Sequence, residues 1–154
     1  MKSLTLFRHA KTERDSESGR DVDRRLEERG RSDAQRVGAQ VRELGLEYDL
    51  VLSSPAARAA ETAELAGLSP RFDERIYDAS AGELLAIVQA ADDAVDRLML
   101  IGHNPGFERL ASRLLGENVE MPAGSLLEIQ LPVESWADAS SGRQVRFLKP
   151  KELA

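Results

Sequence analysis

Two histidines, His9 and His103, are the only imidazole side chains in this chain of 154 residues. Apolar runs typical of buried strands precede both of them, at residues 4–7 and 98–101. In open α/β sheets, ligands bind just beyond the carboxyl ends of parallel strands, so both rings are expected at a site of chemistry. A histidine there can attack phosphorus, and the adjacent Arg8 can form paired hydrogen bonds with phosphoryl oxygens.

Arg58 belongs to the same pattern, because it lies in the first turn of a helix that follows a third apolar run. Ser54 and Pro55 have the residue types of a helix N-cap and first helical position, and Asn104 and Pro105 repeat that pattern. Helix N-termini present N–H groups and a positive dipole end to a ligand. Two arginines, two histidines and two helix starts at one sheet edge predict an anion site, for a phosphoryl group.

Strands and helices alternate along the chain, which predicts an α/β fold: a single domain, residues 1–154, built as a three-layer sandwich around a mainly parallel sheet. Helices are expected at 27–44 and 56–66, and two more are expected to start after Ser80 and after Asn104. Further strands are expected at 49–52, 71–76, 125–131 and 143–148. Residues 11–25 are highly charged and almost free of apolar side chains, which predicts a mobile loop on the rim of the site.

Composition excludes several classes of protein. The absence of cysteine rules out disulfides and thiolate metal sites, and a net charge of −6 argues against a general nucleic-acid binder. No apolar run is long enough to cross a membrane, and the chain enters a strand-like segment directly after Met1 and Lys2, without a signal-peptide core. We therefore expect a cytoplasmic monomer with no nucleic-acid or membrane partner.

The chain resembles the histidine phosphatase superfamily, and within it the small SixA-type phosphohistidine phosphatases. Five motifs carry the resemblance in family order: Arg8-His9-Ala10-Lys11, Leu26-Glu27-Glu28-Arg29-Gly30, Ser53-Ser54-Pro55-Ala56-Ala57-Arg58-Ala59-Ala60-Glu61-Thr62-Ala63, Gly102-His103-Asn104-Pro105-Gly106 and Met121-Pro122-Ala123-Gly124-Ser125. The family's Arg-His-Gly opening is Arg8-His9-Ala10 here, a form common in the SixA-like branch. The likeness covers almost the whole chain and implies the phosphoglycerate mutase-like fold of the superfamily.

The resemblance also implies roles for individual residues. His9 would take the phosphoryl group as a covalent phosphohistidine, while Arg8, Arg58 and His103 would hold the equatorial oxygens and neutralise charge in the transition state. His9 must be neutral to attack, and His103 works best protonated. Two arginines beside His9 discourage its protonation, and a bound phosphate favours charge on His103. No cofactor and no metal are expected, because the cationic side chains replace a metal ion. The arginines would repel a metal ion bound to the two histidines.

The general acid is the part of the site that the sequence leaves open. Larger phosphomonoesterases of the superfamily protonate an alkoxide leaving group with a carboxylic acid. Asp78 and Glu83 are the candidates here, with Glu13 and Asp15 on the charged loop behind them. Glu83 also fits the Ser-x-x-Glu capping box that begins at Ser80, and Asp78 could be a solvated turn residue.

We therefore expect a phosphohistidine phosphatase that acts on a phosphorylated protein. The imidazole of phosphohistidine leaves readily once it is protonated. A compact chain without capping insertions should have an open site, which suits a phosphorylated side chain on another protein. Two alternatives stay open. One is a small-molecule phosphomonoesterase on the same scaffold, acting for instance on a sugar phosphate. The other is a non-catalytic phosphoprotein-binding module, against which the intact set of four site residues argues.

Overall fold

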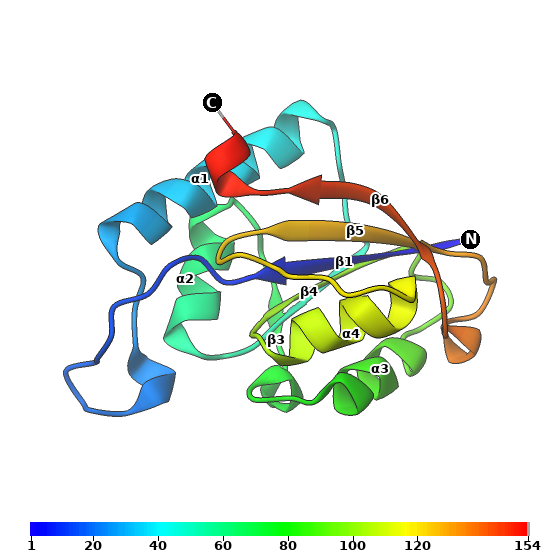
Figure 1. Cartoon of the computed structure of the whole chain (residues 1–154), viewed down its shortest axis with the longest axis horizontal. Coiled ribbons are helices and arrows are strands. Elements are labelled where there is room, and N and C mark those ends of the chain that lie inside the picture. The colour runs from blue at the N-terminus through cyan, green and yellow to red at the C-terminus, as the bar shows by residue number, and fades with distance from the viewer. Residues whose placement is uncertain (154) are drawn as a thin grey trace.

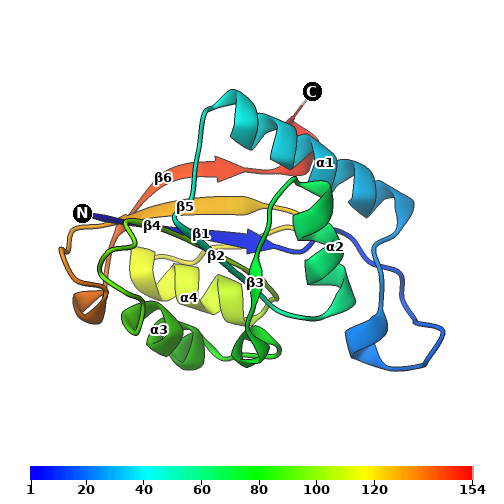
Figure 2. The same ribbon diagram turned by 180° about the vertical axis from the view of Figure 1, so that it is seen from behind.

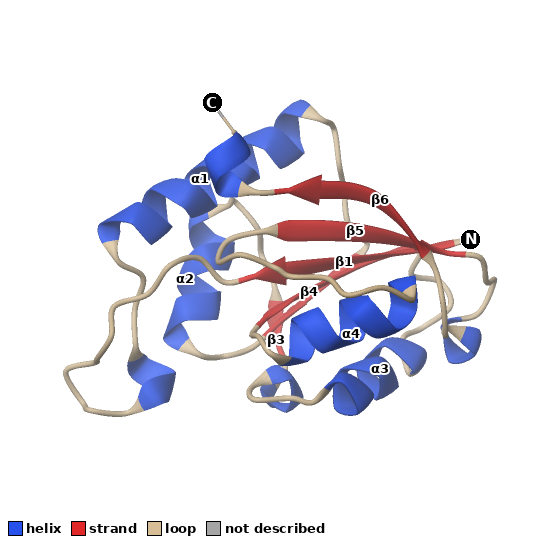
Figure 3. Ribbon diagram, in the orientation of Figure 1, coloured by secondary structure: helices blue, strands red, loops and turns tan. Residues whose placement is uncertain are grey.

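Six strands form one sheet in the order β3-β2-β4-β1-β5-β6, in a computed structural model that describes residues 1–153 (Figures 1 and 3). The strands are β1 Lys2–Arg8, β2 Leu50–Ser53, β3 Arg71–Phe72, β4 Arg97–Gly102, β5 Leu126–Leu131 and β6 Arg143–Leu148. Neighbouring strands are parallel from β3 through β2 and β4 to β1. β5 is antiparallel to both β1 and β6, so the last two strands form an antiparallel hairpin. The mainly parallel sheet confirms the predicted fold class.

Two helices cover each face of the sheet, which makes three layers. They are α1 Glu28–Glu43, α2 Ala57–Leu65, α3 Ala81–Gln89 and α4 Gly106–Leu115. Figures 1 and 2 show α1 and α2 against one face and α3 and α4 against the other. Because side chains alternate along a strand, Leu4 and Leu6 of β1 pack with the core of α3 and α4, and Phe7 packs with that of α1 and α2. Residues 98–101 of β4 are fully buried, as a strand covered on both faces requires.

The helix ends follow local sequence signals. Glycines with positive φ follow α1, α2 and α4, at positions 45, 67 and 116. The capping box is also present: the Ser80 hydroxyl accepts from the N–H of Glu83, and the Glu83 carboxylate accepts from the N–H of Ser80. Glu83 therefore caps the start of α3, as the Ser-x-x-Glu spacing predicts.

Three predicted boundaries are wrong. The Ser-Pro and Asn-Pro patterns place the first helical positions at Pro55 and Pro105, but α2 begins at Ala57 and α4 at Gly106, and neither helix has a side-chain cap. The Ser54 hydroxyl contacts His103 and accepts from the N–H of Ala56, and Asn104 donates to the carbonyl oxygen of Met121. The chain stays non-helical for three residues after each of the two strands. β3 also stops at Phe72, because the Asp73 carboxylate accepts from the N–H of Arg75 and starts a 3₁₀ helix, Glu74–Ile76.

Within residues 1–153 we find no helix with the length and apolar character that a membrane span needs.

Replacing Ser80 with alanine should lower the free energy of unfolding by about 1 kcal/mol, because the first turn of α3 loses its N-cap acceptor. Urea denaturation of the variant and the wild type measures the difference. Glu83→Gln is the matched control: glutamine can still accept from the N–H of Ser80, so its stability should stay near that of the wild type. Equal stability of Ser80→Ala and the wild type would contradict a stabilising cap.

Candidate functional site

The four predicted site residues meet at one edge of the sheet because β2, β4 and β1 are adjacent and parallel. The N–H of His9 donates to the carbonyl oxygen of Gly102 (3.0 Å), which continues the β1–β4 ladder one residue beyond the strand. His9 and His103 therefore leave neighbouring strands side by side, with their ring centroids 5.2 Å apart. Arg58 follows β2, at the second position of α2, and its side chain is 7% exposed.

His9 is held in one orientation by its own backbone neighbour. Its Nδ1 lies 2.8 Å from the carbonyl oxygen of Ala10, which can only accept, so Nδ1 carries the proton of the neutral ring. Nε2 then keeps its lone pair. The loop that carries Ala10 is fixed in turn, because its N–H donates to the hydroxyl of Thr62 (3.0 Å), which donates to the carbonyl oxygen of Arg58. The tautomer leaves Nε2 available as a nucleophile.

The surroundings of His9 keep its ring neutral. Burial lowers the pKa of His9 to about 4, and the positive charges of Arg58 and Arg8 act in the same direction. The hydrogen bond to Ala10 opposes them only in part. The ordinary pKa of histidine is about 6.5, so the ring is uncharged at neutral pH. This agrees with the charge state that a nucleophilic histidine needs.

Arg8 is fixed by the loop between α4 and β5. Its Nη1 donates to the carbonyl oxygen of Met121 (2.8 Å), an oxygen that also accepts from the side-chain amide of Asn104 (3.0 Å). The N–H of Met121 donates to the carboxylate of Glu108 (2.8 Å), a charge that partly offsets the effect of burial on the pKa of Arg8. The Nε atom of Arg8 is buried without a hydrogen-bond partner among the described residues. An anion at this edge would satisfy that donor.

His103 is neutral in this structure, although the sequence suggests that it works best when charged. Its Nε2 lies 2.7 Å from the hydroxyl of Ser54, and its buried Nδ1 has no partner among the described residues. Burial, together with the neighbouring His9 and Arg58, lowers the pKa of His103 to about 3. Ser54, expected as a helix cap, thus orients the second histidine.

Sequence reasoning missed two residues that contact the site, Asp21 and Tyr77. Both N–H groups at the tip of Arg58 donate to Asp21, Nη1 to its backbone oxygen (2.8 Å) and Nη2 to its carboxylate (3.0 Å). The Tyr77 hydroxyl donates to the same carboxylate (2.6 Å), and its ring stands edge-on to His103 at 5.5 Å. Asp21 lies in the highly charged loop, where no local pattern separates it from its neighbours. Tyr77 lies just beyond the segment that the sequence assigned to a strand.

The candidate general acids do not join this cluster through any hydrogen bond of the described residues. Glu83 is exposed and belongs to the capping box. Asp78 is exposed, follows Tyr77 with a φ of +55°, and its side chain makes no hydrogen bond to another described residue. Glu13 and Asp15 line a separate hollow instead.

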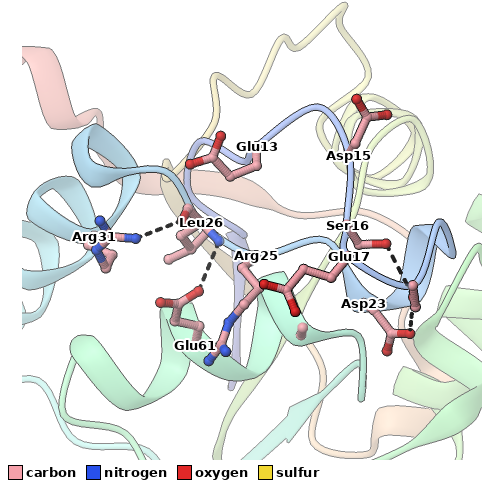
Figure 4. A pocket seen from close by; sticks show the side chains of 11 residues that line it. Glu13, Asp15, Ser16, Glu17, Asp23, Arg25, Leu26, Arg31 and Glu61 are labelled. Atoms are coloured by element: carbon pink, nitrogen blue, oxygen red, sulfur yellow. Dashed lines mark hydrogen bonds between the residues drawn. The ribbon is translucent and has the colours of Figure 1, made fainter.

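That hollow has a volume of about 740 Å³ and lies between the loop of residues 13–26 and the helices α1 and α2 (Figure 4). Glu61 and Arg31 fix the backbone of Leu26 at this hollow. The Glu61 carboxylate accepts from the N–H of Leu26, and Arg31 donates to the carbonyl oxygen of Leu26. Neither histidine lines it, but Ala57, the neighbour of Arg58, does. The hollow therefore borders the histidine site across the first turn of α2.

The described residues contain no group of three or more histidine, aspartate or glutamate side chains arranged to hold a metal ion.

Comparisons with known proteins agree with the sequence motifs. A sequence model of the histidine phosphatase superfamily (branch 1) matches residues 4–119. An uncharacterized chloroplastic protein of Arabidopsis thaliana is 32% identical over 151 residues, which cover 88% of this chain and 69% of that protein. An uncharacterized protein of Mycobacterium leprae is 29% identical over 119 residues, which cover 76% of this chain and 74% of that protein.

Solved structures give the same result. The fold matches a proposed phosphohistidine phosphatase SixA from Nakamurella multipartitia with a TM-score of 0.86 and 25% identity, over 97% of this chain and 96% of that one. A proposed phosphohistidine phosphatase SixA from Agrobacterium tumefaciens matches with a TM-score of 0.83 and 28% identity, over 97% and 98%. The family model covers most of this chain, and the structural matches cover nearly all of it. The chain therefore belongs to the histidine phosphatase superfamily, and its structure is of the SixA type.

Proposed function

We propose that this protein is a metal-independent phosphohistidine phosphatase that acts on a phosphorylated histidine of another protein. The geometry of His9 is the observation that supports this most. Its Nδ1–H is bound to the carbonyl oxygen of Ala10, its Nε2 is bare, and burial with two nearby arginines keeps the ring neutral. A neutral imidazole with one free lone pair is the form that attacks phosphorus.

The reaction has two steps. In the first, the Nε2 lone pair of His9 forms a bond to phosphorus while the bond between phosphorus and the substrate imidazole breaks. The electrons of that bond stay on the leaving ring nitrogen, which takes a proton from solvent water, and the phosphorylated His9 ring, still protonated at Nδ1, carries a positive charge. In the second, water attacks the phosphorus of phospho-His9, releases inorganic phosphate and returns the His9 ring to its neutral form. Arg8, Arg58 and His103 hold the phosphoryl oxygens in both steps.

The charge of His103 changes with the ligand under this proposal. Two arginines and a neutral histidine attract the phosphoryl group, whose negative charge then favours a proton on the His103 ring. The protonated ring donates a further hydrogen bond to a phosphoryl oxygen. The low pKa of His103 in this structure and a donor role in the complex are therefore compatible.

The carboxylates around the site favour a good leaving group. Glu83 is bound in its capping box, and Asp78 is exposed. Asp21 contacts Arg58, but hydrogen bonds from Tyr77 and the arginines hold the pKa of its carboxyl well below the usual range, so it stays ionised and cannot donate a proton. An alkoxide leaves slowly without an acid, whereas an imidazole that accepts a proton leaves easily. A phosphohistidine substrate fits this arrangement better than a sugar phosphate.

A protein substrate is supported by the shape of the surroundings and by the relatives. The hollow of about 740 Å³ is lined by Ala57, the neighbour of Arg58, and leaves room there for residues that flank a phosphorylated side chain. Two structural relatives are described as proposed phosphohistidine phosphatases of the SixA type.

Turnover of a phosphohistidine-containing protein, compared with free phosphohistidine and a panel of sugar phosphates, tests the proposal. We expect the phosphorylated protein to have the highest kcat/KM, and we expect activity to persist in excess EDTA. The variants Asp78→Asn and Glu83→Gln remove the candidate acids singly and should leave turnover of the protein substrate near the wild-type value.

Two outcomes would contradict the proposal. Faster turnover of a sugar phosphate, with at least a hundredfold loss on both substrate types in one of the acid variants, would favour the phosphomonoesterase. Loss of activity in EDTA that one divalent metal restores would contradict a metal-free mechanism.

Replacing His9 with alanine should abolish turnover, because the proposed covalent intermediate forms on its Nε2. Fold and affinity for inorganic phosphate should be largely retained, since the remaining cationic groups are unchanged. Circular dichroism and calorimetric phosphate titration provide the controls. Residual activity above about a hundredth of the wild-type value would rule out nucleophilic catalysis by His9.

Nuclear magnetic resonance can follow both histidines directly, because the chain has only two. In the free protein both rings should still be neutral at pH 6, since burial lowers the pKa of His9 to about 4 and of His103 to about 3. Saturating inorganic phosphate should raise the pKa of His103 more than that of His9. The variants His9→Ala and His103→Ala assign the signals. A His9 ring that titrates near pH 6.5 in the free protein would contradict the neutral nucleophile.

A further inference from the structure

Asp21 joins three parts of the chain that are far apart in sequence. Its carboxylate accepts from Arg58 of α2, from Tyr77 after β3, and from Arg24 of its own loop (3.0 Å). Asp21 begins a 3₁₀ helix, Asp21–Asp23, in the loop of residues 12–25, which we call the rim segment. Arg24 anchors this segment further, because its other N–H groups donate to the carbonyl oxygen of Glu13 (3.0 Å) and the hydroxyl of Thr12 (2.7 Å).

The contact with Asp21 occupies one edge of the Arg58 guanidinium and leaves the other edge free to bind a ligand. Nη1 and Nη2 both donate to Asp21, whereas Nε makes no hydrogen bond to another described residue. The guanidinium is planar and its five N–H groups point in fixed directions. Two hydrogen bonds to a single residue therefore fix the plane of the group. The free edge, formed by Nε–H and the second Nη2–H, can bind two oxygens of a phosphoryl group at once.

Tyr77 depends on the same carboxylate oxygen as Arg58. Its hydroxyl donates to Oδ2 of Asp21, and the guanidinium carbon of Arg58 lies 5.9 Å from the centre of its ring. The Tyr77 ring also stands edge-on to the His103 ring, with the two ring centroids 5.5 Å apart. Asp21 thereby sets the position of an aromatic wall beside the second histidine as well as that of an arginine.

The charge of Asp21 fits this role. The hydrogen bond from Tyr77, followed by those from Arg24 and Arg58, holds the pKa of its carboxyl well below the usual range. The group is therefore a permanent anion that balances part of the positive charge of the arginines. It remains half exposed, so its value to the fold is modest and its main contacts are with residues of the site.

We propose that Asp21 is a positioning residue for phosphoryl binding. It orients Arg58 so that the Nε edge meets the phosphoryl oxygens, and it holds Tyr77 against the place of the leaving imidazole. The second of these roles rests on the proposed function, whereas the first requires only that the site binds phosphate. The rim segment is then part of the active site, connected to it through one carboxylate.

The test compares Asp21→Ala with Asp23→Ala. Asp23 lies on the same 3₁₀ turn, and the same truncation there removes the same charge but only contacts with Ser18 and Arg20. Inorganic phosphate is titrated by calorimetry, and kcat and KM are measured with an aryl phosphate. Asp21→Ala should raise the dissociation constant of phosphate and lower kcat, each by roughly tenfold, the scale of one lost charge-assisted hydrogen bond. Asp23→Ala should stay within about twofold of the wild type on both measures.

Asp21→Asn separates positioning from a general effect on stability. Its amide oxygen can still accept from Arg58 or Tyr77, so it should recover part of the phosphate affinity and kcat that alanine loses. Unchanged phosphate affinity in Asp21→Ala would overturn the proposal. Tighter phosphate binding would also overturn it, and would mean that the carboxylate competes with phosphate for Arg58. The phosphate titration needs no substrate, so a wild type that fails on phosphohistidine would refute the proposed function and leave this inference standing.

Discussion

The pairing of β1 with β4 determines the rest of this site. Parallel strands in register end at the same level, so the residues after Arg8 and Gly102, His9 and His103, emerge next to each other. Gly102 allows the close packing beneath them, because a side-chain carbon there would lie 2.8 Å from Ile76 and 2.9 Å from Phe107. The two rings thus rest on a fully buried strand, which gives them a rigid base.

Bringing two arginines and two histidines together in a buried place costs free energy, and the structure limits this cost in two ways. Both histidines stay neutral, since burial and the neighbouring charges disfavour their protonated forms. Asp21 supplies a negative charge on one edge of Arg58. The remaining donors, including the Nε of Arg8, which has no partner among residues 1–153, attract an anion without further rearrangement. The same electrostatics that strain the free site therefore favour phosphoryl binding.

Backbone carbonyls and short polar side chains do most of the orienting in this site. Ala10 fixes the tautomer of His9, Met121 holds Arg8, and Ser54 meets His103. Such contacts explain why helices α2 and α4 start later than their Ser-Pro and Asn-Pro patterns indicate. The Ser54 hydroxyl contacts His103 as well as the N–H of Ala56, and Asn104 donates to the Met121 carbonyl oxygen that also holds Arg8. A local helix-capping propensity is therefore overridden where the site uses the polar group.

The sequence by itself determined the order of strands and helices, the layer architecture and the four residues at the strand ends. These follow from hydrophobic periodicity and from the rule that parallel strands share a carboxyl edge, which need only local pattern. Only the tertiary structure decided the tautomer of His9 and the place of Asp21 and Tyr77. Asp21 is 37 residues from Arg58 in sequence and 56 from Tyr77, and it lies among many similar charges. No local signal marks such a residue, because its role arises from contacts that form only when distant segments fold together.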